Sequence, residues 1–149
     1  MNLYDILDSS GENKLKKWLS PYLSPEQLDS FNNELLRFFS KEGISERLSF
    51  LNPDVVLSEV ETINKKYEDF YNLKLDGKVK LNLYMHIALM IERLMMHNEG
   101  KVEVEPSSKK ESAFFKITKS IFQPIELKYN IKVSTYEMSL LYELFRQFI

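Results

Sequence analysis

Four N-capping signals constrain the fold of this chain more than any other feature of its sequence. Each one places Ser or Asn before an apolar periodic segment, with Pro at the first helical position or Glu/Gln at the third. Signals of this kind mark the start of an α-helix, so the sequence predicts helices that begin at these four points. The signals are Ser24 with Gln27, Asn52 with Pro53, Ser108 with Glu111, and Ser134 with Glu137.

Apolar residues recur after each signal at the three- and four-residue spacing of a buried helix face. We expect Gly43 to close the first of these helices, and Pro124 to kink or end the helix that follows Ser108. Leu51 and Phe70 are predicted core residues, so alanine at either should cost about 2–5 kcal/mol. The expected buried faces are Leu28, Phe31, Leu35 and Phe38; Val56, Val60, Ile63, Tyr67 and Phe70; Phe114, Ile117 and Ile121; and Met138, Leu141, Phe145 and Phe148.

Residues 79–97 form the most apolar segment, and Asp76 with Gly77 supplies the turn before it. Apolar residues occur on nearly every side of this segment, which predicts one buried helix. Residues 101–105 alternate between charged and apolar, but they have no partner run and are interpreted as a loop.

The sequence therefore predicts an all-α fold with at least five helices and under a tenth of the residues in strands. We place a compact bundle of about five helices at residues 44–149, with residues 1–43 as an N-terminal helical lead-in. Trp18, the only tryptophan, is interpreted as a packing residue of that lead-in.

The polar residues of the 79–97 helix fall on one side of it. At about 100° per residue, Asn82 and Arg93 lie within roughly 40° of His86 around the axis, and His97 lies within roughly 20°. A buried helix has no packing reason to keep such a stripe, so these four residues form the candidate site. A lone histidine in an apolar helix is more commonly a core or interface residue, and the residues alone leave that alternative open.

Composition excludes several classes of function. The formal net charge is −2 and no Lys/Arg stripe repeats along a helix, so direct nucleic-acid contact is not expected. The chain has no cysteine, which excludes disulfides, thiolate metal sites and cysteine nucleophiles. There is no signal-peptide pattern, and no apolar run reaches the roughly 20 residues of a membrane span. We expect a cytoplasmic protein without membrane contact, and the apolar, helical pattern of residues 145–149 suggests a fragment of a longer protein.

No enzyme site can be assembled from the motifs. His86 and His97 are three helical turns apart, about 16 Å along the axis, which is too far for one metal ion. The sequence has no HExxH motif, Gly-rich phosphate loop, GxSxG motif or EF-hand pattern. We therefore expect no enzyme activity, no metal and no cofactor.

A histidine can still accept a phosphoryl group from another protein without a catalytic site of its own. The imidazole needs one exposed, unprotonated nitrogen, which free histidine commonly has at neutral pH. Cationic and amide groups nearby then stabilise the added charge. In this interpretation His86 is the acceptor, and Arg93 and Asn82 support the phosphate.

Three segments carry a resemblance to a known family: Leu51-Asn52-Pro53 with the helix to Tyr71, residues 85–94 (MHIALMIERL), and Ser134-Thr135-Tyr136-Glu137. Together they resemble the PTS regulation domain (PRD), a helical bundle of bacterial antiterminators and activators of sugar-uptake operons. The likeness covers about residues 44–149, and the histidine followed by Ile-Glu-Arg is its most specific part. The combination of Phe50-Leu51-Asn52-Pro53 with His86-Ile87-Ala88 is most similar to the C-terminal PRD of sigma-54-dependent, levulose-operon-type activators.

The resemblance implies that His86 is the phosphorylated histidine and that Arg93 occupies the position of a family arginine. It also implies phosphorylated HPr or EIIB of the sugar phosphotransferase system as donor, and a homodimer whose packing responds to phosphate. Many PRDs carry a second histidine seven residues after the position of Glu137, where this chain has Leu144. At most one family phospho-site is therefore present, which argues against two histidines facing each other across a dimer.

Two other interpretations remain open beside a non-enzymatic, phosphorylation-sensing regulatory domain. A structural dimerisation module would keep His86 buried and inert, whereas an acceptor must expose a ring nitrogen. An unrelated helical enzyme or ligand-binding bundle would need a pocket beside His86 that Arg93 also lines.

Overall fold

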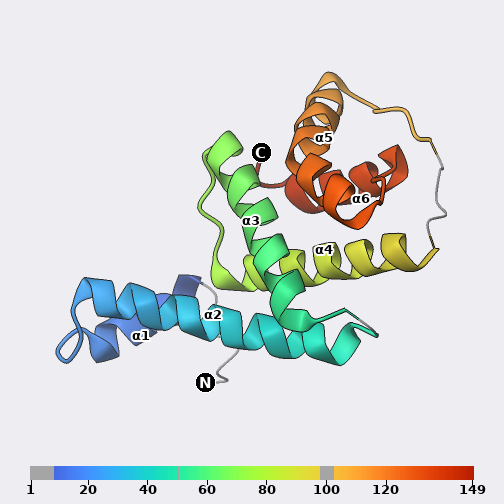
Figure 1. The fold of residues 1–149 in the computed structure, drawn as a ribbon. Coiled ribbons are helices and arrows are strands. Elements are labelled where there is room, and N and C mark those ends of the chain that lie inside the picture. The colour runs from blue at the N-terminus through green and yellow to red at the C-terminus, as the bar shows by residue number, and fades with distance from the viewer. Residues whose placement is uncertain (1–8, 50, 98–102) are drawn as a thin grey trace.

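The computed structural model describes residues 9–49, 51–97 and 103–149. Within these ranges the regular structure consists of six helices without any strand, which confirms the all-α prediction. Of the predicted loop at 101–105, residues 103–105 are irregular, and residues 101 and 102 lie outside the described ranges. The helices are α1 (Ser9–Leu19), α2 (Pro25–Arg47), α3 (Pro53–Tyr71), α4 (Gly77–His97), α5 (Lys109–Tyr129) and α6 (Thr135–Phe145) (Figure 1).

All four capping signals start helices where the sequence places them. Ser24 and Gln27 exchange two hydrogen bonds of 2.9 and 3.2 Å, which complete the capping box of α2. The side chains of Asn52, Ser108 and Ser134 each accept a hydrogen bond from a backbone N–H two or three residues further on. Local hydrogen bonding therefore determines where α2, α3, α5 and α6 begin.

The helices are arranged around α4, which crosses the body of the molecule (Figure 1). The second half of α2 packs against α3 and α4, and α3 packs against both α4 and α5. α5 and α6 pack together on the opposite side of α4 from α2 (Figure 1). The first half of α2 extends past the body and is accompanied by α1. The predicted boundary at residue 43 falls inside α2, so one continuous helix joins the lead-in to the bundle.

An aromatic cluster ties α3, α5 and α6 together. The ring of Tyr67 lies 5.5 Å from that of Phe114 and 4.4 Å from that of Phe145, measured between centroids. The three side chains are fully buried, and the Tyr67 hydroxyl meets the Thr118 hydroxyl at 2.7 Å. Burial raises the pKa of the Tyr67 phenol, so this hydroxyl stays neutral and hydrogen-bonded inside the core.

Three aromatic residues of the hairpin formed by α1 and α2 are exposed, which corrects the prediction that they pack inside. Trp18 is 62% exposed and Phe38 is 56% exposed, and Phe31 is also exposed. The buried positions of α2 instead include Leu36 and Ile44, which repeat at four-residue intervals through Ser40. Leu28 is buried and Leu35 is partly buried, as the spacing predicted. The repeat turns the buried face more than about 100° away from Phe31 and Phe38, so the periodicity was wrong for these two residues.

Two residues that were expected to end or bend helices lie inside them. α2 continues through Gly43 to Arg47, and a Cβ atom added at Gly43 would lie 3.1 Å from the Sδ atom of Met85. The glycine therefore allows α2 and α4 to approach closely, rather than ending α2. α5 likewise continues five residues beyond Pro124 to Tyr129, and Asn130 ends it in the left-handed conformation.

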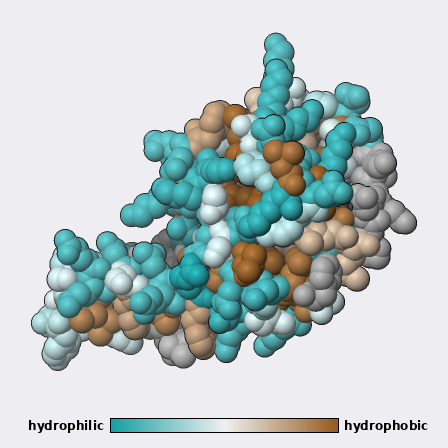
Figure 2. Space-filling view, viewed as in Figure 1, coloured by the Kyte–Doolittle hydropathy of each residue, from teal (hydrophilic) through white to brown (hydrophobic). Residues whose placement is uncertain are grey.

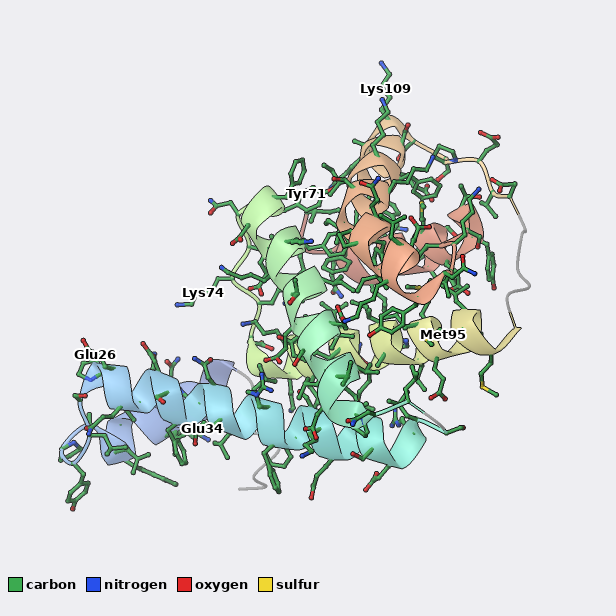
Figure 3. The ribbon with its side chains drawn as sticks, in the orientation of Figure 1. Glu26, Glu34, Tyr71, Lys74, Met95 and Lys109 are labelled. Atoms are coloured by element: carbon green, nitrogen blue, oxygen red, sulfur yellow. The ribbon has the colours of Figure 1, made fainter. Side chains whose placement is uncertain are left out.

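Phe70 lies on the surface rather than in the core, and Leu51 is only partly buried. Tyr71 takes the inner position at the end of α3, where its ring stacks 6.4 Å from that of Phe114 (Figure 3). Phe70 packs edge-on against Tyr71 and remains 57% exposed. The apolar stripe of α3 therefore shifts by one position near its C-terminal end, where neighbouring helices cover only one side.

Replacing Phe70 with alanine should lower the free energy of unfolding by less than about 1 kcal/mol, because its ring loses little buried area. Urea denaturation would measure this change. Phe38→Ala is a matched control, since Phe38 is similarly exposed on α2. A loss of about 3 kcal/mol or more at Phe70 would show that its ring is buried after all.

Polar side chains cover most of the face drawn in Figure 2, and its hydrophobic patches are separated from one another. Among the residues that the structure describes, no helix combines the length and the apolar character that crossing a membrane requires.

Candidate functional site

α4 presents His86 to solvent while its opposite side fills the core. Leu83, Ile87 and Ile91 are almost completely buried on the inner side. Asn82, His86 and Arg93 are all exposed, on the side where the helical spacing placed them together. The exposure of His86 meets the first requirement for an acceptor of a group from another protein. His97 is the last residue of α4, and its side chain lies outside the described part of the structure.

Arg93 joins α4 to α6 through a bidentate ion pair with Glu137. Its Nε and Nη2 atoms donate to Oε1 of Glu137 at 3.2 and 2.7 Å, and Nη2 also lies 2.7 Å from Oε2. The Glu137 side chain is only 9% exposed, whereas that of Arg93 is 50% exposed. Arg93 follows His86 by seven residues, about 10 Å along the helix axis. The structure therefore brings Arg93 to Glu137, and a role in supporting phosphate on His86 stays a prediction.

Glu92 anchors the connection between α2 and α3. Its carboxylate accepts hydrogen bonds from the backbone N–H of Ser49 at 2.9 and 3.1 Å and from that of Leu51 at 3.3 Å. Glu92 is buried, so these bonds lie where water competes poorly. The three consecutive residues of the Ile-Glu-Arg motif therefore make different contacts. Ile91 packs in the core, Glu92 binds the α2–α3 connection, and Arg93 binds α6.

The sequence interpretation missed these roles of Glu92 and Glu137. Glu92 is the only acidic residue among residues 79–97. A carboxylate inside an apolar helix indicates that it accepts hydrogen bonds from buried donors. Glu137 was recognised only as part of the capping signal of α6. Nothing local in the sequence indicates that its carboxylate meets a residue 44 positions away.

The Arg93–Glu137 pair should contribute measurably to stability. Arg93→Met should lower the free energy of unfolding by about 1–2 kcal/mol, because it leaves the nearly buried Glu137 carboxylate unpaired. The loss should be smaller than for a fully buried pair, since the Arg93 side chain is half exposed to solvent. A double-mutant cycle with Glu137→Gln would measure the coupling by urea denaturation. The exposed pair Arg146–Glu143 on α6 is the matched control and should show almost no coupling. Equal coupling energies in the two pairs would contradict the prediction that the Arg93–Glu137 ion pair stabilises the attachment of α6 to α4.

α6 runs antiparallel to α4 alongside the exposed stripe. Leu144 and Asn82 line the same cavity of about 300 Å³, and Glu137 meets Arg93 eleven residues further along α4. His86 lies between Asn82 and Arg93 in the sequence of α4. The other residues that line the cavity are Lys78, Val79, Leu83, Gln147 and Phe148.

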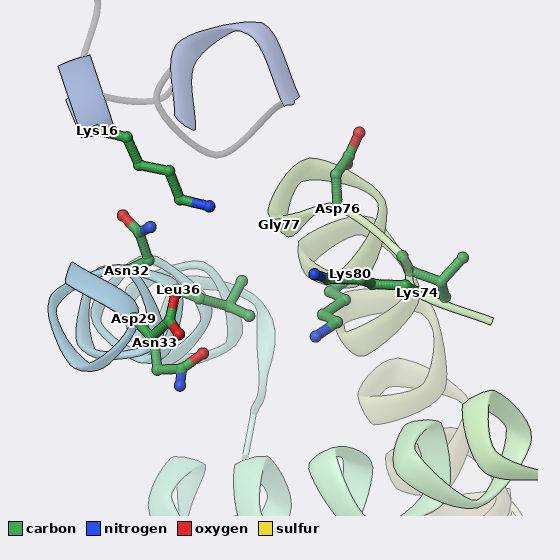
Figure 4. Close-up of a pocket in the computed structure, with 10 residues that line it drawn as sticks. Lys16, Asp29, Asn32, Asn33, Leu36, Lys74, Asp76, Gly77 and Lys80 are labelled. Atoms are coloured by element: carbon green, nitrogen blue, oxygen red, sulfur yellow. The ribbon is translucent and has the colours of Figure 1, made fainter. Parts of the chain in front are cut away.

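A second cavity, of about 270 Å³, lies between the hairpin and the α3–α4 turn (Figure 4). Lys16, Lys74 and Lys80 line it together with Asp29 and Asp76, so its charges nearly balance. Neither His86 nor Arg93 lines any of four cavities found in the part of the chain that the structure describes. The pocket that a ligand-binding bundle would need beside His86 is therefore not found among them.

The described residues also contain no group of three or more His, Asp or Glu side chains placed to hold a metal ion. The polar stripe of α4 instead presents one histidine, one amide and one arginine that is already paired. Chemically, such a surface can offer an imidazole nitrogen to a group that arrives from outside the chain.

Comparison with known proteins gives two positive findings. A model of the PRD domain family matches residues 61–148, more than half of the chain, including His86, Arg93 and Glu137. The transcriptional regulatory protein DagR of Salmonella typhimurium (strain 14028s / SGSC 2262) is 28% identical over 149 aligned residues. That alignment covers 97% of this chain but 16% of the relative, so the chain spans about a sixth of that protein's length. No solved structure matches the chain.

Proposed function

Because this chain belongs to the PRD domain family, we propose that it is the phosphorylation-sensing domain of a bacterial regulator of sugar-uptake genes. Its similarity to a transcriptional regulatory protein supports the regulatory part of this proposal. The observation that carries it is the exposure of His86 on a helix whose other face fills the core, inside the matched region. The domain itself would be non-enzymatic and would act in the cytoplasm.

His86 would receive a phosphoryl group from a phosphohistidine of HPr or EIIB. An unprotonated ring nitrogen of His86 attacks the phosphorus atom and forms a new N–P bond. The N–P bond of the donor breaks, and its electron pair returns to the donor nitrogen. One proton leaves the other ring nitrogen of His86 and one is taken up by the donor imidazole, so the charges balance.

Phosphorylation adds up to about two negative charges at His86, and these need water or donors around them. The exposed position supplies water, and the amide of Asn82 lies one helical turn away on the same side. Arg93 would need to loosen its contact with Glu137 to approach the phosphate. We expect the added charge to shift a monomer–dimer equilibrium, since a few kcal/mol at an interface changes populations about a hundredfold.

A second candidate function is a structural dimerisation module without phosphorylation. The ion pair between Arg93 and Glu137 favours this alternative, because the guanidinium that the first proposal assigns to the phosphate is already bound to a carboxylate. His86 is exposed, however, whereas a structural module was expected to keep it buried. The two candidates differ in whether His86 is chemically used.

The deciding experiment is incubation with phosphorylated HPr and, separately, with phosphorylated EIIB, followed by peptide mapping of acid-labile phosphate. The proposed function requires label on the peptide that contains His86 from at least one donor. A chain that stays unlabelled with both donors, yet remains folded by circular dichroism, would be a structural module.

A further inference from the structure

We propose that the cavity between the hairpin and the α3–α4 turn binds a small organic phosphate that also carries hydroxyl groups. We call it the lysine cavity, because Lys16, Lys74 and Lys80 line it (Figure 4). The inference goes beyond the proposed function and does not depend on it, since His86 is not among the residues that line this cavity.

Three lysines from separate elements extend into the lysine cavity. Lys16 comes from α1, Lys74 from the α3–α4 turn and Lys80 from the start of α4. Figure 4 shows the side chains of Lys74 and Lys80 pointing toward α2, and that of Lys16 pointing into the space between α2 and the α3–α4 turn. Ammonium groups that converge on one space attract a ligand of the opposite charge.

The acidic residues of the cavity do not fully cancel this charge. Three lysines with Asp29 and Asp76 give the lining residues a formal charge of +1. The Asp76 carboxylate caps α4, because its Oδ1 atom accepts a hydrogen bond of 3.0 Å from the backbone N–H of Val79. Lys80 also lies 3.8 Å from Glu68. An ammonium group has three N–H donors, so a lysine that contacts one carboxylate keeps donors for a ligand.

A buried amide donor is a second, independent indication of a ligand. The Nδ2 atom of Asn32 is shielded from solvent, and it meets no acceptor among the residues that the structure describes. Leaving a buried NH2 group unsatisfied costs free energy. Asn32 lines the lysine cavity from α2 (Figure 4), and half a turn of its amide toward the cavity breaks no hydrogen bond of this donor. An oxygen atom of a bound phosphate would then accept from it.

The size and the lining of the cavity fit a small polar molecule. Its volume of about 270 Å³ has room for about nine water molecules, at roughly 30 Å³ each, which is more than a single ion fills. Leu36 and Leu75 are the apolar side chains in its lining, so the ligand needs little apolar surface. Asp29 and Asn33 line it from α2 and supply oxygen atoms that accept hydrogen bonds from hydroxyl groups.

Phosphate fits the three lysines better than a carboxylate does. A phosphate ester carries about 1.5–2 negative charges at neutral pH and has three acceptor oxygens. A carboxylate carries one charge and has two oxygens, so it leaves more of the positive charge unpaired. The ligand class that matches the lining is therefore a phosphate monoester with hydroxyl groups.

The proposed ligand would fasten the hairpin to the bundle. Lys16 and Asn32 precede the residues that the PRD model matches, whereas Lys74 and Lys80 lie within them. A molecule bound between these residues joins the N-terminal helices to the family domain. Because the ligand must leave before the hairpin can separate from the α3–α4 turn, binding should slow amide hydrogen exchange in α1.

The test is an NMR titration of the full chain at fixed ionic strength with glycerol 3-phosphate, inorganic phosphate and glycerol. We expect a Kd of about 1 mM or lower for glycerol 3-phosphate, binding of inorganic phosphate at least about fivefold weaker, and no binding of glycerol. Lys16→Gln and Asn32→Asp should each raise the Kd of glycerol 3-phosphate about tenfold, because each removes a donor to a charged oxygen. Lys17→Gln is the matched control, since it removes the same charge from an exposed position of α1 outside the cavity, and its Kd should be unchanged.

Equal Kd values for Lys16→Gln and Lys17→Gln would overturn the proposal, because the anion would then respond to net charge alone. Equal affinity for inorganic phosphate and glycerol 3-phosphate would overturn it as well, and so would unchanged amide signals at about 20 mM glycerol 3-phosphate. Circular dichroism checks that each variant is folded, and Lys16→Gln tests the same cavity from a different helix than Asn32→Asp. Labelling of His86 by a phosphorylated donor decides the proposed function separately.

Discussion

His86→Ala should abolish phosphotransfer from HPr and EIIB, lowering the incorporated phosphate at least a hundredfold below that of the unsubstituted chain. The reason is chemical, because the substitution removes the only nitrogen nucleophile on the exposed stripe that the structure describes. The free energy of unfolding should change by less than about 0.5 kcal/mol, since an exposed side chain makes few buried contacts. Phosphopeptide mapping and urea denaturation of the same preparation measure both effects.

The control for this prediction is the other histidine of the chain. His97→Ala should be labelled as well as the unsubstituted protein, because His97 lies three turns from the acceptor position. Arg93→Ala should weaken the labelling or the proposed shift of a monomer–dimer equilibrium, and it should also destabilise the attachment of α6. Undiminished labelling of His86→Ala, or label found on His97 alone, would refute the assignment of the acceptor.

Glu92→Gln should lower the free energy of unfolding by about 2–4 kcal/mol, the largest stability effect expected here for a substitution that conserves side-chain volume. The buried carboxylate accepts from the backbone N–H groups of Ser49 and Leu51, and hydrogen bonds to charged acceptors are worth about 1.5–3 kcal/mol. A glutamine amide is uncharged and has only one oxygen. In either orientation its NH2 group would therefore face the N–H group of Ser49, which lies 2.9 and 3.1 Å from the two carboxylate oxygens of Glu92. Urea denaturation measures the total loss.

Amide exchange locates the same effect in the structure. The N–H groups of Ser49 and Leu51 should exchange at least about tenfold faster in Glu92→Gln, because their acceptor is weakened. Glu46→Gln, on the exposed face of α2, is the matched control and should change neither stability nor exchange at these two sites. Unaltered protection of Ser49 and Leu51 in Glu92→Gln would show that the α2–α3 connection is held by other contacts.

Several features of this protein follow from the sequence because their causes are local. The capping side chain of each helix bonds a backbone N–H only two or three residues away, so Ser24, Asn52, Ser108 and Ser134 determine the helix starts wherever the helices later pack. The angle between residues of one helix is equally local. Asn82, His86 and Arg93 therefore lie on one side of α4 both by spacing and in the structure.

Only the tertiary structure decided which periodic apolar residues are buried and which charges meet. Tyr71 points inward and Phe70 outward because Phe114, 43 residues after Tyr71, packs on one side of the end of α3. Gly43 lies within α2, where its missing side chain leaves room for Met85 of α4. Arg93 is paired because the start of α6 brings Glu137 beside it. These outcomes depend on how whole helices cross and how far each one is covered. Local spacing does not contain that information, because the same periodicity is compatible with many packings.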